Sequence, residues 1–413
     1  MAGHVQDRWY KTETDANGKE SRTKSDRYGT GLRYRARYVG PDGTEKSKSF
    51  PDGKKRLAEK WLSKTETDMD SGQYVDPRAA RTTFRQYAER WLVTQGGDPN
   101  TRASMESQLR LHAFPYIGSR PLGSFQPEHI REWLAKLEGS GVRGPYARTI
   151  YSNARAVLSA AVDDGYLHRN PCSARTVKAP AVERKRVVPW TVPRVFGVRA
   201  ALPERYRSMV DLGAGCGLRQ GEILGVSVDA LSFEDGLLHV VQQLKLSRSK
   251  PVFAPPKGGK LRDVPIPEPV ADALRAHMKQ FPPVEVTLPW ATPDGPKVTK
   301  QLLFTGPMGN HVWRTSLNEE AWKPALVAAG VIPEPETKEE RYAAAREHGM
   351  HALRHFYASA LLDGGENIKA VSEYLGHGDP GLTLRVYAHL MPSSQERTRK
   401  AVAAVYDAAR ATR

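Results

Sequence analysis

Five short motifs in the C-terminal half of the chain carry residue types that could break a phosphodiester bond. Along the chain they are Gly217-Leu218-Arg219-Gln220-Gly221-Glu222, Pro256-Lys257-Gly258-Gly259-Lys260-Leu261-Arg262, His351-Ala352-Leu353-Arg354-His355, Leu375-Gly376-His377 and Thr383-Leu384-Arg385-Val386-Tyr387. Such a reaction needs a nucleophile, a route for protons, and cations that stabilise the charge growing on the phosphate oxygens. Arginine suits the last task, because its planar guanidinium can donate two hydrogen bonds to one phosphate.

The spacing of the third motif predicts that two of its side chains contact the same phosphate. His351 and Arg354 are three residues apart, which puts both on one face of a helix, whereas Leu353 would point into the core. Tyr387 is the candidate nucleophile. A phenol has a pKa of about 10 in water, so Tyr387 must lose its proton during the attack. Neighbouring guanidinium groups and a histidine would lower that barrier.

Taken in this order, the five motifs resemble the catalytic signature of the tyrosine recombinases of the phage integrase family. The resemblance implies that Tyr387 forms a covalent 3′-phosphotyrosine and releases a 5′-hydroxyl, with neither ATP nor a metal. It also implies that Lys257 protonates the leaving 5′ oxygen, that His351 exchanges a proton with the tyrosine, and that His377 donates to a phosphate oxygen. The implied catalytic set is Arg219, Lys257, His351, Arg354, His377 and Tyr387.

Three further residues of the motifs receive supporting or alternative roles. We expect Glu222, three residues after Arg219, to orient an arginine or a backbone amide rather than to take part in the chemistry. Lys257 fits the Pro-Lys register of the family, and Lys260 stays open as the alternative general acid. Tyr374 is assigned to the core.

The histidines allow a second interpretation, a zinc site. His348, His351 and His355 lie close together in the sequence, His377 and His389 could converge on them, and three histidines can hold zinc. However, the HExxH motif is absent from the sequence, and two arginines favour an anionic substrate over a cation. We therefore predict no metal and no cofactor.

Composition indicates a polyanionic partner. The 413 residues contain 62 Lys and Arg against 46 Asp and Glu, a net charge of +16, and such a surplus favours nucleic acid. The two cysteines exclude a disulfide framework and a cysteine-ligated zinc module. Mean hydropathy is −0.56, and no apolar run approaches the roughly 20 residues of a membrane helix. The N-terminus lacks the apolar stretch of a signal peptide, so we expect a cytoplasmic, nucleoid-associated protein with no membrane partner.

Residues 1–75 are predicted to form a small DNA-binding module. From Leu32 to Tyr38 the sequence alternates between an arginine face and an apolar face, which is typical of a strand. A turn at 40–43, a returning strand at 46–50 and a helix in which Leu57, Trp61 and Leu62 share one side would follow. Such a basic ribbon fits a DNA groove, although a solvated strand would show the same pattern. The expected DNA contacts are Arg33, Arg35, Arg37, Lys46 and Lys48.

The rest of the chain divides into a helical part and a mixed part. Four apolar stripes at helical spacing predict a compact bundle over residues 82–172. A basic linker over 173–189 follows, in which Arg184, Lys185 and Arg186 could track phosphates. Residues 190–394 would form the catalytic domain, and 395–413 a tail helix that packs on a neighbouring protomer.

Within the catalytic domain the sequence predicts short strands, helices and two insertions. The strands are expected at Leu237–Leu244 and Leu261–Ile266 and the helices at Pro269–Gln280, Val312–Ala329, Met350–Asp363 and Ile368–Leu375. The segments 281–300 and 333–348 are interpreted as insertions of undetermined structure.

The expected fold class is therefore multidomain. It consists of a small α+β N-terminal domain with a three-stranded sheet and a helix, an all-α core-binding (SAM-like) bundle, and a mostly α catalytic domain with a small antiparallel sheet. The resemblance implies site-specific recombination that integrates and excises a phage or mobile element. Four protomers would act on two DNA duplexes at core-type and arm-type sites, with a host DNA-bending protein and an excision directionality factor as further partners. The alternatives are a type IB topoisomerase-like enzyme, a non-catalytic DNA-binding regulator and a metal-dependent nuclease.

Overall fold

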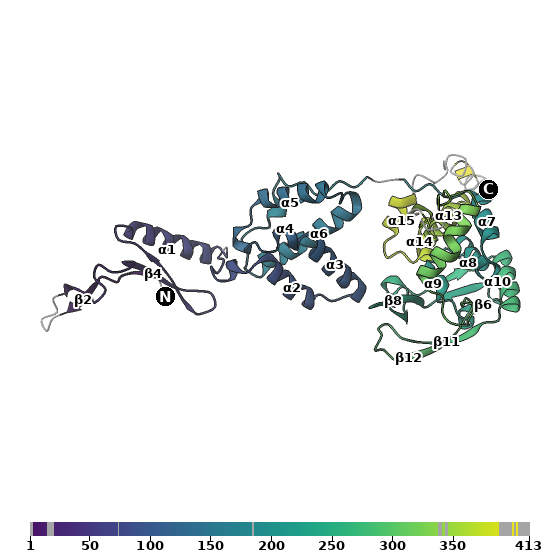
Figure 1. The fold of residues 1–413 in the computed structure, drawn as a ribbon, viewed down its shortest axis with the longest axis horizontal. Helices are drawn as coiled ribbons and strands as arrows, with labels where there is room; N and C mark the ends of the chain where they lie inside the picture. The colour runs from purple at the N-terminus through teal and green to yellow at the C-terminus, as the bar shows by residue number, and fades with distance from the viewer. Residues whose placement is uncertain are drawn as a thin grey trace, which may run out of the picture. The chain divides into compact units, whose positions relative to one another are not determined.

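The computed structural model describes residues 3–14, 20–72, 74–183, 186–337, 341–342, 346–387, 399 and 402–403. The chain forms two compact units, Met1–Glu183 and Arg184–Arg413 (Figure 1). Among the described residues, no helix is long and apolar enough to cross a membrane. Arg184, Lys185, His389 and nearly all of the predicted tail helix lie outside the described residues.

The first unit begins with a three-stranded antiparallel sheet that is covered by one helix. The strands β1 (His4–Asp7), β4 (Tyr34–Val39) and β5 (Glu45–Phe50) lie in the order β1-β4-β5, and α1 (Lys55–Asp70) packs on β4. The apolar face of the predicted alternation is buried at Tyr34, Ala36 and Tyr38. Hydrophobic burial on one face is therefore what fixes the register of this sheet.

Two details of this module differ from the sequence prediction. Leu32 lies before the strand and is 43% exposed, and Leu57 in α1 is 51% exposed. The buried face of α1 instead carries Ala58, Leu62 and Thr65. This face is rotated toward the small residue Ala58, which lets the helix approach the sheet.

A second hairpin in this module was not predicted. Strands β2 (Tyr10–Thr14) and β3 (Glu20–Lys24) pair antiparallel, with Tyr10 opposite Lys24. Their sequences are almost entirely polar, so no alternation of apolar and polar residues identifies them as strands. Lys24 lies over the ring of Tyr28 and Arg22 over that of Tyr10, and aromatic rings thus replace a hydrophobic face.

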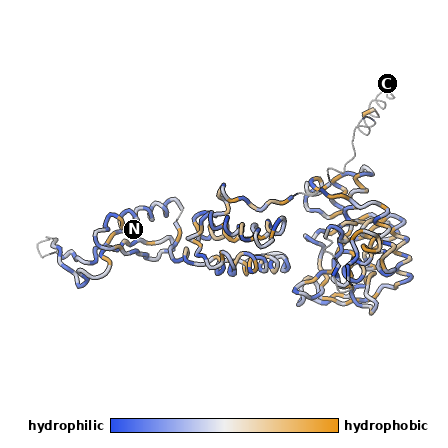
Figure 2. The backbone as a smooth tube through the Cα atoms, turned by 45° about the horizontal axis from the view of Figure 1, so that its top comes forward, coloured by the Kyte–Doolittle hydropathy of each residue, from blue (hydrophilic) through white to orange (hydrophobic). Residues whose placement is uncertain are grey.

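The remainder of the first unit is helical. It contains α2 (Phe84–Thr94), α3 (Pro99–His112), α4 (Phe114–Ile117), α5 (Pro127–Gly139) and α6 (Gly144–Asp163). The apolar stripes face a common core, which includes Phe84, Leu109, Trp133 and Leu158. Figure 2 shows hydrophobic and hydrophilic residues mixed along the backbone of these helices. Sequence signals also set the helix starts, because Thr83 and Gln86 form a capping box at α2.

The second unit is built around a small sheet with strand order β10-β7-β6. Its strands are β6 (Leu231–Ser232), β7 (Leu237–Val240) and β10 (Arg262–Pro265), and a separate hairpin of β8 (Gln243–Ser247) and β9 (Lys250–Ala254) lies between β7 and β10 in sequence. The prediction of one strand over Leu237–Leu244 is therefore wrong. The strand is broken because the buried side chain of Gln242 donates to the carbonyl of Gly225 and to Ser227 Oγ.

The predicted insertion at 281–300 belongs to a regular hairpin. Strands β11 (Val284–Pro289) and β12 (Lys297–Leu302) pair antiparallel along their whole length. Val286, Leu288 and Leu302 are buried on one face, so the hairpin is part of the core of this unit. In the second predicted insertion, 333–348, residues 338–340 and 343–345 lie outside the described part of the chain.

Nine further helices complete the described part of this unit. They are α7 (Val192–Ala201), α8 (Glu204–Gly215), α9 (Gln220–Leu224), α10 (Glu268–Gln280), α11 (Arg314–Ser316), α12 (Lys323–Ala328), α13 (His351–Asp363), α14 (Ile368–Leu375) and α15 (Pro380–Tyr387). The predicted continuous helix over Val312–Ala329 is interrupted by a π-helical segment, Leu317–Trp322. Pro324 explains the interruption, because it has no N–H to continue the α-helical hydrogen bonds.

Glycines allow the central helices of this unit to pack closely. A Cβ on Gly213 of α8 would lie 2.7 Å from Leu353 Cδ1 of α13. Gly217 has a φ of +66°, and a Cβ there would lie 2.4 Å from the ring of Tyr357. Because neither glycine has a Cβ, α13 can pack closely against α8 and the segment that leads into α9. That segment carries Arg219, and α13 carries Arg354.

Candidate active site

Helix α13 carries one of its predicted catalytic residues at the surface and the other in the interior. His351 at its first turn is exposed, whereas Arg354 is 0% exposed. Leu353 is fully buried in the core, as the sequence predicts. The guanidinium of Arg354 donates from Nη1 to the carbonyl of Gly217 at 2.7 Å and from Nη2 to the carbonyl of Leu375. Arg354 therefore joins α13 to the segment before α9 and to the end of α14.

A buried carboxylate links two more arginines. The side chain of Glu222 has no exposed surface. Its Oε1 accepts from Arg219 Nη1 at 2.8 Å and from Arg262 Nη1 at 3.1 Å, and its Oε2 accepts from Arg262 Nη2 at 2.6 Å. Oε2 also accepts from the backbone N–H of Arg219 at 2.9 Å. Glu222 thus contacts both kinds of group that the sequence analysis considered, an arginine and a backbone amide.

Arg262 is a residue of this centre that the sequence analysis did not single out. It lies on β10, its side chain is 5% exposed, and its Nε donates to the carbonyl of Tyr374 at 2.6 Å. A Cβ on Gly376 would lie 3.1 Å from Arg262 Cδ, so a larger residue there would crowd the guanidinium. The available signal was the position of Arg262 inside the second motif.

His377 follows a left-handed turn at the end of α14. Gly376 has a φ of +61°, a conformation that glycine adopts without strain, and its carbonyl accepts from Arg219 Nη2 at 3.4 Å. The Nδ1 atom of His377 lies 2.7 Å from Thr383 Oγ1 on α15. If the threonine hydroxyl donates to Nδ1, the ring proton is on Nε2 and can be donated to a phosphate oxygen.

The candidate nucleophile contacts a histidine other than the predicted one. Tyr387, the last residue of α15, is 2% exposed, and its hydroxyl lies 2.6 Å from Nδ1 of His355. The ring of His351 lies 4.7 Å from that of His355. His355 belongs to the third motif, but its sequence position alone gave no reason to assign it to the tyrosine.

The two candidate general acids lie on an exposed turn. Lys257 begins the short turn Lys257–Gly259 before β10, and Lys260 follows it. Both side chains are exposed. Within the described part of the chain, neither belongs to the network of arginines around Glu222.

Burial and charge have opposite effects on the ionisation of this centre. Burial alone would raise the pKa of Glu222, but the hydrogen bond and charge of Arg262 and the charge of Arg219 hold that pKa below its usual value. Burial, together with the charge of Arg219, lowers the pKa of Arg354 to about 9, so Arg354 is still protonated at neutral pH. Three guanidinium groups against one carboxylate leave a positive site, which suits a phosphodiester.

The histidines are held neutral at physiological pH. Burial lowers the pKa of His351, His355 and His377 to about 4 each. The charge of Arg354 lowers all three pKa values further, and for His351 the neighbouring His355 has a larger effect than Arg354. Although the ring of His351 is partly exposed, the surrounding cations act on it as well. Neutral imidazoles can accept a proton, as the proposed chemistry requires.

The predicted DNA-contacting arginines of the first module are partly engaged within the protein. Arg33 is paired with Asp7 and Asp52, at 2.9 Å each, and is 19% exposed. Arg37 pairs with Glu45 at 2.8 Å, and Arg35 donates to Ser47. Arg33 therefore has a structural role in the sheet.

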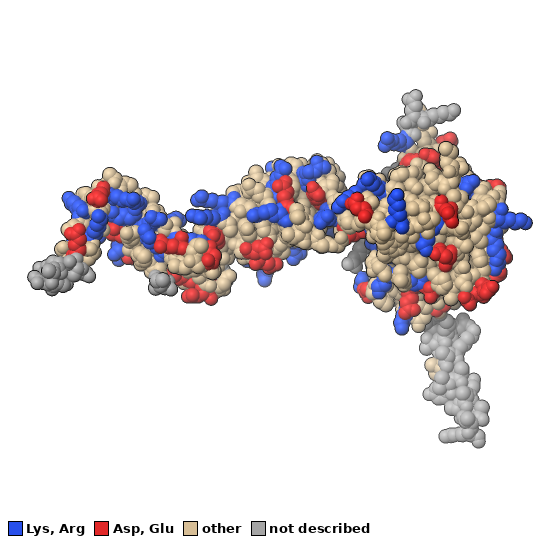
Figure 3. Space-filling view, turned by 90° about the horizontal axis from the view of Figure 1, so that it is seen from below, with Lys and Arg blue, Asp and Glu red and all other residues tan. Residues whose placement is uncertain are grey.

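The predicted lysines and the linker residues have different environments. Lys46 pairs with Asp76 at 2.7 Å and Asp42 at 3.0 Å and is 14% exposed. Lys48 is exposed beside Trp61, and Arg186 of the linker is exposed. Figure 3 shows Lys and Arg side chains interspersed with Asp and Glu over both units.

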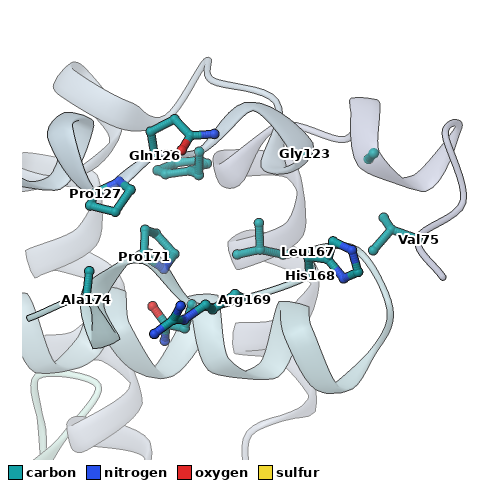
Figure 4. Close-up of a pocket in the computed structure, with 12 residues that line it drawn as sticks. Val75, Gly123, Gln126, Pro127, Leu167, His168, Arg169, Pro171 and Ala174 are labelled. Carbon is teal, nitrogen blue, oxygen red and sulfur yellow. The ribbon is translucent and has the colours of Figure 1, made fainter. Parts of the chain in front are cut away.

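The described residues also bear on two other kinds of site, a metal site and a small-molecule pocket. No group of three His, Cys, Asp or Glu side chains in this part of the chain could hold a metal ion. A pocket of about 470 Å³ in the first unit is lined by side chains that include His168 and Arg169 (Figure 4). None of the predicted site residues lines this pocket, so it gives no support to a small-molecule site at the motifs.

Comparison with known families matches both units. A model described as the phage integrase family matches residues 192–394, and one described as the phage integrase central domain matches residues 84–177. A putative prophage phiRv2 integrase of Mycobacterium tuberculosis is 26% identical over 386 residues, covering 90% of this chain and 93% of that protein. A tyrosine recombinase XerC-like protein of Caldanaerobacter subterraneus subsp. tengcongensis is 27% identical over 281 residues, 64% of this chain and 68% of that protein.

Solved structures support the same fold. The Tn1549 transposon integrase in complex with a circular intermediate DNA matches with a TM-score of 0.63 at 20% identity, covering 77% of this chain and 98% of that one. A lambda integrase tetramer bound to a Holliday junction matches with a TM-score of 0.52 at 16% identity, covering 84% and 93%. The fold is therefore an α+β multidomain arrangement with many helices and small antiparallel sheets.

The ion pairs of Glu222 generate a prediction about stability. Glu222→Gln leaves two neighbouring guanidinium groups without their carboxylate, and breaking a buried pair typically costs about 3–5 kcal/mol. The free energy of unfolding, measured in urea, should fall by that amount. Glu268→Gln is the matched control, because Glu268 pairs with Arg275 at the exposed surface, where such a pair is worth about 0–1 kcal/mol. Equal losses in the two variants would contradict the prediction.

Proposed function

This chain belongs to the phage integrase family of tyrosine recombinases, and on that premise we propose how it acts on DNA. It is a site-specific recombinase that cleaves and rejoins DNA strands through a covalent 3′-phosphotyrosine, and so integrates and excises a phage or mobile element. A type IB topoisomerase-like enzyme and a non-catalytic DNA-binding regulator are not favoured, because the integrase models match the helical unit as well as the motif-bearing unit.

One observation carries the assignment of the site. Residues from four separate segments, which the sequence motifs single out, are linked by direct contacts. Arg354 of α13 contacts the carbonyls of Gly217 and Leu375, and Arg219 contacts the carbonyl of Gly376. Tyr387 of α15 contacts α13 through its hydroxyl. A chance set of surface residues would not share such a network.

In the proposed reaction, the cations bind the phosphate and the tyrosine attacks it. Arg219 and Arg354 donate to the non-bridging oxygens, and His377 donates from Nε2. The phenolic oxygen of Tyr387 forms a bond to phosphorus while the bond from phosphorus to the 5′ oxygen breaks. These donors oppose the negative charge that grows in the transition state.

Two protons must move in this step. The proton of Tyr387 passes to a histidine of α13, for which the family resemblance indicates His351. Lys257 gives its proton to the leaving 5′ oxygen. The phosphotyrosine retains the energy of the phosphodiester, so attack by a 5′-hydroxyl reverses both transfers and rejoins DNA without ATP.

The finer organisation is proposed from charge and family resemblance. Residues 1–75 bind arm-type sites, 82–172 bind core-type sites, 173–189 form the basic linker, 190–394 catalyse, and 395–413 pack on a neighbouring protomer. The lambda integrase described as a tetramer on a Holliday junction supports four protomers acting on two duplexes. A host DNA-bending protein and an excision directionality factor are proposed as partners, and the cytoplasmic nucleoid as the location.

The nucleophile can be tested with a duplex selected from a random pool by binding to the full chain and then nicked within the bound region. In EDTA, the wild-type protein should form an adduct that resists denaturation, and Tyr387→Phe should form none while its affinity for the duplex stays unchanged. Denaturing electrophoresis measures the adduct, and a filter assay measures binding. An adduct formed by Tyr387→Phe would show that the nucleophile is another residue.

The general acid can be tested by changing the leaving group. Lys257→Ala should form the adduct about 10²- to 10⁴-fold more slowly. Replacing the bridging 5′ oxygen by sulfur should restore most of the rate, because a thiolate leaves without protonation. Lys260→Ala is the matched control on the same turn and should need no such rescue. Rescue of Lys260→Ala alone would reverse the assignment.

The first module should contact DNA chiefly through its less engaged arginines. Replacing Arg35 and Arg37 together by Ala should weaken binding to long selected duplexes and make its salt dependence shallower, by about 0.9 in log–log slope for each lost phosphate contact. Arg33→Ala should lower the melting temperature of the module instead, since Arg33 pairs with two carboxylates. A salt slope that is unchanged in the double variant would exclude the ribbon from the interface.

A further inference from the structure

We propose that the β2–β3 hairpin carries a second DNA-contacting surface of the first module, which binds phosphates of a duplex without reading its bases. This hairpin surface consists of Lys24, Arg27 and Tyr28. The inference rests on the proposed function, because it takes residues 1–75 as a DNA-binding module. It deepens that function by assigning a role to a hairpin that the predicted contacts on β4 and β5 leave out.

Three aromatic rings at the base of the hairpin lie outside the hydrophobic core of the module. The ring centroid of Tyr28 lies 5.9 Å from that of Trp9 and 5.4 Å from that of Tyr10. None of the three belongs to the core cluster that contains Tyr34 and Ala36, and Tyr28 is 43% exposed. A two-stranded hairpin is at best marginally stable by itself, so polar contacts must hold this one in place.

Ion pairs and a backbone bond fix the hairpin to the three-stranded sheet. The carboxylate of Asp7 on β1 accepts from Arg22 on β3 and, at 2.9 Å, from Arg33 just before β4. The backbone N–H of Arg8 donates to the carbonyl of Arg33 at 2.8 Å. Figure 1 shows the hairpin extending beyond the end of β4. The hairpin therefore presents its side chains at a fixed place relative to the sheet.

Two cations of the hairpin surface are available to a ligand. The side chains of Lys24 and Arg27 are exposed, unlike the arginines that pair with Asp7. Nζ of Lys24 lies 4.2 Å from the centroid of the Tyr28 ring. This contact orients the ammonium group but leaves its charge uncompensated, since an aromatic ring carries no net charge. Within the described part of the chain, no carboxylate lies within ion-pair distance of Lys24 or Arg27.

The charge and the ring contacts favour phosphates as the ligand. Residues 8–33 contain seven Lys and Arg against four Asp and Glu, so a second copy of the hairpin would be repelled. Single strands bind by stacking their bases on open aromatic faces, but here cations lie over the rings of Trp9, Tyr10 and Tyr28. The rings thus hold cations in place, and duplex phosphates are the groups that such cations bind.

The backbone next to Tyr28 leaves room for a bulky ligand. Gly29 and Gly31 have φ values of +77° and +65°, and a Cβ at either position would meet no atom of the described chain within 4 Å. All residues from Tyr28 to Gly31 are exposed. The backbone of a duplex can therefore approach the main chain here without a steric conflict.

The salt dependence of DNA binding tests the hairpin surface. The full chain with both Lys24→Gln and Arg27→Gln, the hairpin double variant, should bind a long selected duplex with a log–log salt slope that is shallower by about 1.8, or about 0.9 for each lost phosphate contact. Its affinity deficit should therefore shrink about tenfold between about 50 and 200 mM salt. Lys60→Gln with Lys64→Gln is the matched control, because both lysines are exposed on α1 of the same module.

Two outcomes of this measurement would overturn the inference. One is a wild-type salt slope in the hairpin double variant. The other is an equal change in the control, which would indicate the net charge of the chain rather than a local contact. The melting temperature should be unchanged in both variants, since all of the substituted side chains are exposed.

Chemical interference distinguishes phosphate contacts from base readout. Ethylation of single phosphates should block binding of the wild-type chain at a set of positions, and those that the hairpin surface contacts should no longer block the hairpin double variant. Methylation of guanine N7, which probes the major groove, should give the same pattern for both proteins. A changed guanine pattern would overturn the inference in favour of base readout, and an unchanged ethylation pattern would overturn it altogether.

A third measurement needs no substitution. Acetic anhydride acetylates exposed lysines, and mass spectrometry of peptides resolves each position. Bound duplex should protect Lys24 of the wild-type chain, whereas Lys60 should stay reactive. Unchanged reactivity of Lys24 would overturn the inference, and equal protection by a single strand of the same length would overturn it in favour of a single-stranded ligand.

Failure of the proposed function is distinguishable from failure of this inference. A wild-type chain that forms no adduct with the nicked duplex would contradict the proposed function. A wild-type chain that forms the adduct, while the hairpin double variant keeps the wild-type salt slope, would contradict the inference alone.

Discussion

The buried carboxylate of Glu222 is the interaction on which the rest of the site depends. Three guanidinium groups converge in the second unit, and each loses hydration as the core closes around it, a cost that only close pairing can offset. Glu222 accepts from Arg219 and Arg262 with both of its oxygens. The same bonds position the elements, because Arg262 extends to the carbonyl of Tyr374 on α14. The three bonds to Glu222 and the bond from Arg262 to Tyr374 thus set both the charge balance of the site and the positions of its elements. A substitution that changes one of these properties therefore also changes the other.

Neutral histidines complete this arrangement. With their pKa values near 4, the imidazoles add no positive charge to a site that already contains Arg219, Arg262 and Arg354. A bound phosphate would raise those pKa values, because a nearby negative charge favours the protonated form. Binding of substrate therefore prepares the histidines to accept a proton at the stage when the tyrosine has one to lose.

The sequence predicted what local patterns determine and missed what distant contacts determine. The bounds of α14 and the burial of Leu353 follow from helical periodicity, and both agree with the structure. Arg262 and His355 were missed because their partners lie 40 and 32 residues away, and no spacing rule connects such positions. The single strand expected over Leu237–Leu244 failed for a similar reason, since the buried amide of Gln242 bonds to a loop 17 residues earlier. Likewise, the alternation from Leu32 to Tyr38 predicts a basic face, but it does not identify Asp7 and Asp52, the two carboxylates that pair with Arg33.

The junction between α14 and α15 contains groups that the proposed reaction assigns to phosphate binding. Gly376 accepts from Arg219, and His377 contacts Thr383 of α15. A phosphate that accepts a hydrogen bond from Arg219 therefore competes with the carbonyl of Gly376 at that junction, whereas donation from Nε2 of His377 leaves its Nδ1 in contact with Thr383. A ligand can shift a conformational equilibrium only by its differential affinity for the two states, and this competition supplies such a difference. A charge-assisted contact to phosphate is roughly twice as strong as a hydrogen bond between neutral groups, so exchange of the 3.4 Å bond between Arg219 and the carbonyl of Gly376 for a bond to phosphate favours the bound state.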